Sequence, residues 1–262
     1  MSKKSIVFIH GLWIHSSSWK PWIEFFSQRG YETLNPGWPG DSKTVAESRA
    51  NPQLIANRGV TEVADNYGKI ISSLAEPPIV IGHSFGGVIA QIILGRGIAA
   101  AGIALDPAPI KGVWQLPFSA LKASFPVLGN PFNLKKAVSL SFSQFRYGFA
   151  NAVPEEEARE LYDKWTIPAP ARPLFQAATA SFAGSETKVN TANNTRGPLL
   201  ITGGEKDHIA PPVLGKASSK KYNDSVVTDF KLFQNRGHSL TLDHGWREVA
   251  EYSLAWLNRN GC

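Results

Sequence analysis

The stretch Gly82-His83-Ser84-Phe85-Gly86-Gly87 places a serine between glycines that stand two residues before and two residues after it. A short apolar run, Pro78–Ile81, precedes the stretch, and a longer apolar run, Val88–Ile93, follows it. This order predicts a buried strand, a sharp turn at Ser84 and a helix that begins directly afterwards. A serine that serves as a nucleophile needs such a strained turn, in which only glycine fits on either side. An ordinary glycine-rich turn is the alternative, but the strand before the serine and the helix after it favour a nucleophile elbow.

Two residues further along the chain could activate this serine. A neutral serine hydroxyl is a weak nucleophile, so it needs a base to take its proton and an acid to orient that base. His238 follows the predicted strand Asp229–Phe233 and precedes the last predicted helix, which makes it the candidate base. Asp207 follows the apolar strand that ends at Gly203-Gly204 and is the candidate acid. Asp106, at the end of the strand that begins at Ala101, is the alternative acid.

A fourth strand ends in a motif of the same kind. The apolar run Ser5–Ile9 leads directly into His10-Gly11-Leu12-Trp13. With this motif, the chain resembles the α/β-hydrolase superfamily over nearly its whole length, because the four strand-end motifs occur in the Ser…Asp…His order of that architecture. The resemblance implies a serine hydrolase whose oxyanion hole is formed by the backbone N–H groups of Leu12 and Phe85.

The rest of the chain fits the same architecture. Apolar spacing predicts a helix over 19–26, a strand over 31–34 and a helix over 60–74. Alternating strands and helices indicate an α/β fold with a mainly parallel, doubly wound sheet. Since only four residues precede Ser5, the sheet should lack the first two strands that the family often has.

Alternation stops between Pro107 and about Asn190, where prolines and bulky apolar residues accumulate. We expect an α/β-hydrolase core over 1–106 and 191–262, with 107–190 as a helical cap inserted into it. A cap over Ser84 is favoured over a helical subdomain that packs only on itself, because ligands bind at the carboxyl ends of the strands, where this insertion emerges. Trp13 and His15 are candidates for lining the pocket, although simple packing explains them equally well.

Composition excludes several other classes of protein. The 262 residues are 43% hydrophobic, which suits one large domain. The net charge of +6 comes from scattered lysines and arginines, so we expect no nucleic-acid partner. The one cysteine is Cys262, and the histidines do not have the spacing that is typical of metal ligands. We therefore expect neither a metal nor an organic cofactor. No apolar run approaches the ~20 residues of a membrane span, and we expect a cytoplasmic protein without a membrane partner. The sequence leaves the oligomeric state open.

These observations together predict the reaction class. We expect a serine hydrolase that cleaves a small-molecule carboxylic ester, thioester or lactone with a small-to-medium apolar group, through an acyl-enzyme. Relatives with the same triad suggest carbon–carbon bond hydrolysis or hydroxynitrile-lyase chemistry as alternatives. A peptidase would need cap carboxylates to hold an ammonium group, and Glu155–Glu157 look instead like a solvated helix start. A non-catalytic ligand-binding receptor on the same scaffold is the alternative from a different class.

Overall fold

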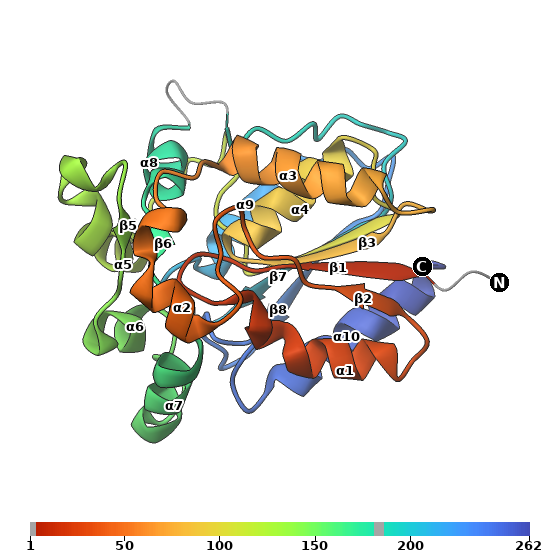
Figure 1. The fold of residues 1–262 in the computed structure, drawn as a ribbon. Coiled ribbons are helices and arrows are strands. Elements are labelled where there is room, and N and C mark those ends of the chain that lie inside the picture. The colour runs from red at the N-terminus through yellow and green to blue at the C-terminus, as the bar shows by residue number, and fades with distance from the viewer. Residues whose placement is uncertain (1–3, 181–185) are drawn as a thin grey trace.

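Six parallel strands form the centre of the protein. The computed structural model describes residues 4–180 and 186–262. The strand order is β2-β1-β3-β4-β7-β8 (Figure 1), and every pairing in this sheet is parallel. The strands are β1 (Ser5–Ile9), β2 (Glu32–Leu34), β3 (Ile79–His83), β4 (Ala101–Leu105), β7 (Leu199–Gly204) and β8 (Thr228–Phe233). The predicted fold class is therefore confirmed, and β1 is the first strand in the described part of the chain.

Helices cover both faces of the sheet, because side chains alternate along each strand. In β1, Ile6 and Phe8 pack toward one face, whereas Val7 and Ile9 pack toward the other. The first face is covered by α1 and α10, and the second by α3, α4 and α9 (Figure 1). The helices are α1 (Lys20–Ser27), α3 (Val60–Ser72), α4 (Phe85–Gly95), α9 (Pro212–Ser219) and α10 (Trp246–Arg259).

The strand order reverses direction between β1 and β3. From β1 the chain moves outward to β2 through α1, and from β3 it moves the opposite way to β4 through α4. Right-handed crossovers in opposite directions place α1 and α4 on opposite faces. A crevice at the carboxyl ends of the strands forms at such a switch point, and it is where ligands bind in open α/β sheets. The turn that contains Ser84 and the His10-Gly11 turn both lie there.

A long insertion between β4 and β7 lies beyond the carboxyl ends of the strands (Figure 1). It contains α5 (Phe118–Leu128), η3 (Pro131–Asn133), β5 (Ala137–Val138), α6 (Phe142–Gly148), α7 (Glu155–Trp165), β6 (Ala169–Pro170) and α8 (Arg172–Thr179). Two of these helices begin at prolines, because Pro154 precedes α7 and Pro173 lies in the first turn of α8. Residues 181–185 of the predicted cap lie outside the described residues.

Sequence patterns did not predict every element. The antiparallel pair β5–β6 is too short to produce a period of two. Near the core, η1 (Ser16–Trp19), α2 (Val45–Ala50) and η2 (Pro52–Leu54) were also not predicted. A capping box at Thr44 and Glu47 begins α2 and is the sequence signal that could have revealed this helix.

Candidate active site

Ser84 occupies the tight turn between β3 and α4. Its backbone has φ 56° and ψ −121°, a conformation that L-residues rarely adopt. A Cβ at Gly82 would lie 2.0 Å from the carbonyl oxygen of Gly86, and a Cβ at Gly86 would lie 2.1 Å from that of Ile9. Both positions therefore require glycine, which is the physical reason for the sequence pattern around the serine.

His238 and Asp207 form a buried pair. The Nδ1 atom of His238 lies 2.6 Å from Oδ2 of Asp207, and both side chains are fully buried. The other carboxylate oxygen of Asp207 accepts hydrogen bonds from the backbone N–H groups of Ile209, at 2.7 Å, and Ala210, at 2.8 Å. The Nε2 atom of His238 is buried and has no hydrogen-bond partner among the described residues. Asp207 thus occupies one ring nitrogen and leaves the other unoccupied.

His83, next to the serine, holds the backbone of His238. Its Nε2 donates to the His238 carbonyl oxygen at 2.9 Å, and the two rings lie 4.6 Å apart. Burial, followed by the neighbouring His238, lowers the pKa of His83 well below its ordinary value, so its ring is neutral. Phe149 presents its ring to His238 at 4.8 Å. These contacts fix the position of the imidazole.

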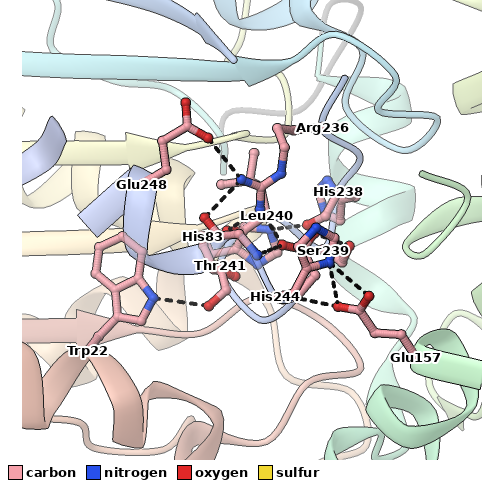
Figure 2. Close-up of polar contacts among 12 residues, drawn as sticks. Trp22, His83, Glu157, Arg236, His238, Ser239, Leu240, Thr241, His244 and Glu248 are labelled. Carbon is pink, nitrogen blue, oxygen red and sulfur yellow. Dashed lines mark hydrogen bonds and ion pairs between the residues drawn. The ribbon is translucent and has the colours of Figure 1, made fainter. Parts of the chain in front are cut away.

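The loop that carries His238 is stabilised by a second set of polar contacts (Figure 2). Arg236 forms a buried ion pair with Asp243, and Asp243 also accepts from the hydroxyl of Ser239 at 2.8 Å. Trp22 on α1 donates to the carbonyl of Thr241 at 3.0 Å (Figure 2). Sequence patterns did not reveal Arg236 or Asp243, because ion pairs across a loop leave no periodic signal.

Asp106, the alternative acid, lies beside Asp207 and does not take its place. Its oxygens accept from the Thr202 hydroxyl and the Gly204 N–H, each at 3.0 Å. Burial, and then the charge of Asp207, raise the pKa of Asp106 well above its usual range. Burial also opposes ionisation of Asp207, but the charge and hydrogen bond of His238 and the bond to Asp106 bring the pKa of Asp207 below its ordinary value. The two carboxyls therefore share one proton, which Asp106 holds, and Asp207 is the anion.

Potential metal ligands cluster at one place among the described residues. Ligand-type atoms of Asp106, Asp207 and His238 lie within 4.8 Å of one another. The His238–Asp207 bond and the shared proton account for this proximity, so the cluster needs no ion to hold it together.

The His10-Gly11 turn packs directly against the serine. A Cβ at Gly11 would lie 2.7 Å from Cβ of Ser84, so this position also requires glycine. His10 contacts Asp41 through Nε2 at 2.7 Å, and its carbonyl accepts from the Trp38 indole at 3.0 Å. Asp41 thus holds the turn in place.

Leu12 and Phe85 flank Ser84 from the two turns. Phe85 is the first residue of α4, so its N–H has no partner within the helix. Within the described residues, the N–H of Leu12 likewise makes no hydrogen bond to the backbone or to a side chain. Neither N–H group is therefore used by a backbone contact of the fold in the described part of the chain.

An uncharged cavity of about 160 Å³ opens at Ser84. Trp13 and Phe85 line it from the core, and Trp114, Leu116 and Leu121 are among the insertion residues that line it. Trp13 is thus placed where the sequence suggested, but His15 is not. His15 is buried elsewhere, with Nδ1 bonded to the hydroxyl of Ser17 and Nε2 to the carbonyl of Ser42, because it caps η1.

Comparison with known proteins supports the same architecture. The alpha/beta hydrolase family model matches residues 6–252, whereas no curated protein matches the chain. Among solved structures, a monoacylglycerol lipase from Paleococcus ferrophilus is 20% identical with a TM-score of 0.68, covering 98% of this chain and 96% of its own. A thermophilic esterase from Thermogutta terrifontis is 16% identical with a TM-score of 0.69, covering 98% and 90%. A methylesterase from Arabidopsis is 15% identical with a TM-score of 0.66, covering 97% and 99%. Together with the match of the family model to almost the whole chain, the fold and the serine turn show that this protein belongs to the alpha/beta hydrolase family.

Proposed function

We propose that this protein is a serine hydrolase that cleaves carboxylic esters, thioesters or lactones carrying a small-to-medium apolar group. The observation that carries the proposal is the strained Ser84 turn, which opens into an uncharged cavity and whose neighbouring residue His83 contacts the buried His238–Asp207 pair. A serine nucleophile needs a base and a residue that orients this base, and we assign these roles to His238 and Asp207.

The reaction begins with proton transfer from the hydroxyl of Ser84 to Nε2 of His238. The serine oxygen attacks the substrate carbonyl, and the N–H groups of Leu12 and Phe85 stabilise the oxyanion. His238 then gives the proton to the departing alcohol or thiol, which leaves the acyl group on Ser84. Water, deprotonated by the same nitrogen, releases the carboxylic acid and restores the serine. Asp207 holds the histidine tautomer and stabilises the imidazolium in both halves.

The cavity sets the size of the substrate. Its volume of about 160 Å³ is close to that of an apolar cavity known to bind benzene, ~150 Å³. It therefore suits one aromatic ring or an acyl chain of about six carbons. Among its lining residues in the described chain, none is charged. A peptidase for free amino termini is disfavoured, because a buried ammonium group would lack its carboxylate.

A series of p-nitrophenyl esters, from acetate to dodecanoate, tests this proposal. Each added CH₂ buried in the cavity should raise kcat/KM about fourfold, since it contributes ~0.8 kcal/mol. The increase should stop at about six carbons and then reverse. Leu174→Ala, which enlarges the cavity, should move the optimum to longer chains, whereas Leu54→Ala, at an exposed site outside it, should not. A flat profile would mean that the cavity does not bind the acyl group.

Labelling identifies the nucleophile. A fluorophosphonate should form a stable adduct on Ser84, detected by mass spectrometry of the peptide. Ser84→Ala should lose the adduct and about 10⁶ of kcat. Turnover by Ser84→Ala within tenfold of the parent would refute the mechanism. An adduct without turnover of esters, thioesters, lactones or cyanohydrins would favour a binding protein.

A further inference from the structure

Large apolar side chains are exposed together around α5 in the insertion. Phe118 and Phe132 are each 79% exposed, and Phe125 is 71% exposed. Of the ten large hydrophobic residues that are exposed in the described chain, seven lie in this one stretch: Trp114, Leu116, Phe118, Leu121, Phe125, Phe132 and Leu134. Large contiguous apolar surface of this kind marks an interaction site. We call these seven residues the α5 surface.

The α5 surface contains a groove that runs toward the candidate active site. Phe118, Leu121 and Phe125 lie three and four residues apart on α5, so they share one helix face. With Tyr147 of α6 they line an open groove of about 550 Å³. Leu121 also lines the cavity at Ser84, as do Trp114 and Leu116. The exposed apolar surface is therefore continuous with the cavity that holds the candidate nucleophile.

Charge in this part of the chain has one sign. Residues 107–153 contain five cations and no aspartate or glutamate: Lys111, Lys122, Lys135, Lys136 and Arg146. The whole chain carries a formal charge of +6, so this stretch contains most of the excess. Lys122 lies over the ring of Tyr147 at 4.2 Å, inside the groove, and Lys135 and Lys136 are exposed beside Phe132 and Leu134.

An anionic lipid interface complements both the exposed apolar side chains of the α5 surface and the positive charge of residues 107–153. Aromatic rings enter the boundary between headgroups and acyl chains, and lysines nearby attract anionic headgroups. A second copy of the chain fits less well, because pairing two α5 surfaces would bring two sets of cations together without an acid from this stretch. Peripheral docking needs no spanning helix, and none of the helices in the described residues is long and apolar enough to span a bilayer.

We propose that the α5 surface docks the protein on an anionic lipid interface, and that apolar ester substrates pass from this interface into the cavity at Ser84. Docking is independent of the function proposed above, whereas delivery of substrate rests on it. The proposal departs from the expectation of no membrane partner, because the exposure of these side chains is set by packing within the insertion.

Co-sedimentation with vesicles tests docking separately from catalysis. The full-length Ser84→Ala chain should bind vesicles of equimolar phosphatidylcholine and phosphatidylserine at least about tenfold more tightly than vesicles of phosphatidylcholine alone, and salt should weaken binding. Adding Phe118→Ser and Phe125→Ser should reduce this affinity by about tenfold or more. Val213→Ser with Val227→Ser, at exposed apolar sites elsewhere, should leave it unchanged.

Turnover of a short soluble ester separates the two proposals. Phe118→Ser with Phe125→Ser in the active chain should retain that turnover within twofold of the parent, since neither residue lines the cavity at Ser84. Equal vesicle binding by parent and phenylalanine variant, or no binding to either vesicle, would overturn docking. A dimer in sedimentation equilibrium that the phenylalanine variant dissociates would also overturn it and make the α5 surface a subunit interface. Vesicle binding without any ester turnover would leave docking standing and refute the catalytic proposal.

Discussion

Asp106→Asn should change how the stability of the protein depends on pH. Asp106 is buried at the carboxyl end of β4, where its oxygens accept from Thr202 and Gly204 and its carboxyl shares a proton with Asp207. Asparagine has nearly the same shape, keeps a carbonyl oxygen for one of these donors and offers an amide N–H toward Asp207. The substitution therefore removes a titrating group and changes the packing little.

The size of the effect follows from proton linkage. Burial, and then the charge of Asp207, raise the pKa of Asp106 well above its usual value, so the folded protein holds a proton that the unfolded chain loses near pH 3.9. The stability from this proton is fully present below about pH 4 and is lost as the pH rises through the folded pKa. Asparagine has no such loss. The free energy of unfolding of the variant should gain about 1.4 kcal/mol per pH unit relative to the parent, until that pKa is passed.

Urea unfolding followed by tryptophan fluorescence measures this difference at intervals of one unit from about pH 5 to about pH 8. The other groups that face Asp106, namely Asp207, His238 and His83, are present in both proteins, so their contributions largely cancel. Asp224→Asn, at an exposed site, should run parallel to the parent. If the Asp106→Asn curve also ran parallel to the parent, Asp106 would carry no extra proton in the folded state and the shared-proton interpretation would be wrong.

Three further substitutions test the site and its support. In Asp207→Asn the amide oxygen should keep its hydrogen bonds to the backbone N–H groups of residues 209 and 210, so the NH₂ group turns toward His238 and imposes the wrong tautomer. The kcat for a p-nitrophenyl ester should fall about 10⁴-fold. A loss below tenfold would exclude this role of Asp207. Gly86→Ala would place a Cβ 2.1 Å from a β1 carbonyl oxygen, so calorimetry should show a Tm about 6–12 °C lower; an unchanged Tm would contradict the glycine requirement. Arg236→Met leaves Asp243 buried without its ion-pair partner and should lower the free energy of unfolding, measured with urea, by about 3–5 kcal/mol. The double variant Arg236→Met with Asp243→Leu should regain most of this loss. A double variant as unstable as the single one would contradict the explanation that the unpaired charge of Asp243 causes the loss.

Much of the fold could be predicted because its signals are local. The apolar run before Ser84 and the glycines at 82 and 86 predicted β3, the turn and α4, since a backbone with positive φ and close carbonyl contacts restricts the residues that fit. Alternation of strand and helix predicted a parallel sheet, because parallel strands must be joined by a long crossover connection, which is usually an α-helix. The candidate nucleophile and base followed from their places at strand ends.

Distances across the sheet were decided by the tertiary structure alone. Strands β4 and β7 are neighbours, so Asp106 and Asp207 reach the same place, and the sequence left Asp106 open as an alternative to Asp207. The loop after β7 orients Asp207 as the partner of His238, because its backbone N–H groups bind one Asp207 oxygen and leave the other free for the histidine. The burial that keeps the proton on Asp106 likewise depends on residues far away in the chain.

In the insertion, too, local sequence predicted some features and tertiary contacts decided others. Sequence placed an apolar, helical segment between two strands, because composition and prolines are properties of the chain. Whether Phe125 packs inside or faces solvent depends on which neighbours α5 meets, and here those neighbours leave it exposed. For His15 the sequence left a place in the pocket and simple packing open, and the hydrogen bond from its ring to the Ser42 carbonyl, 27 residues away, favours packing. The sequence alone determined the main strands and helices of the core and their order, whereas long-range contacts decided which side chains meet and which remain exposed.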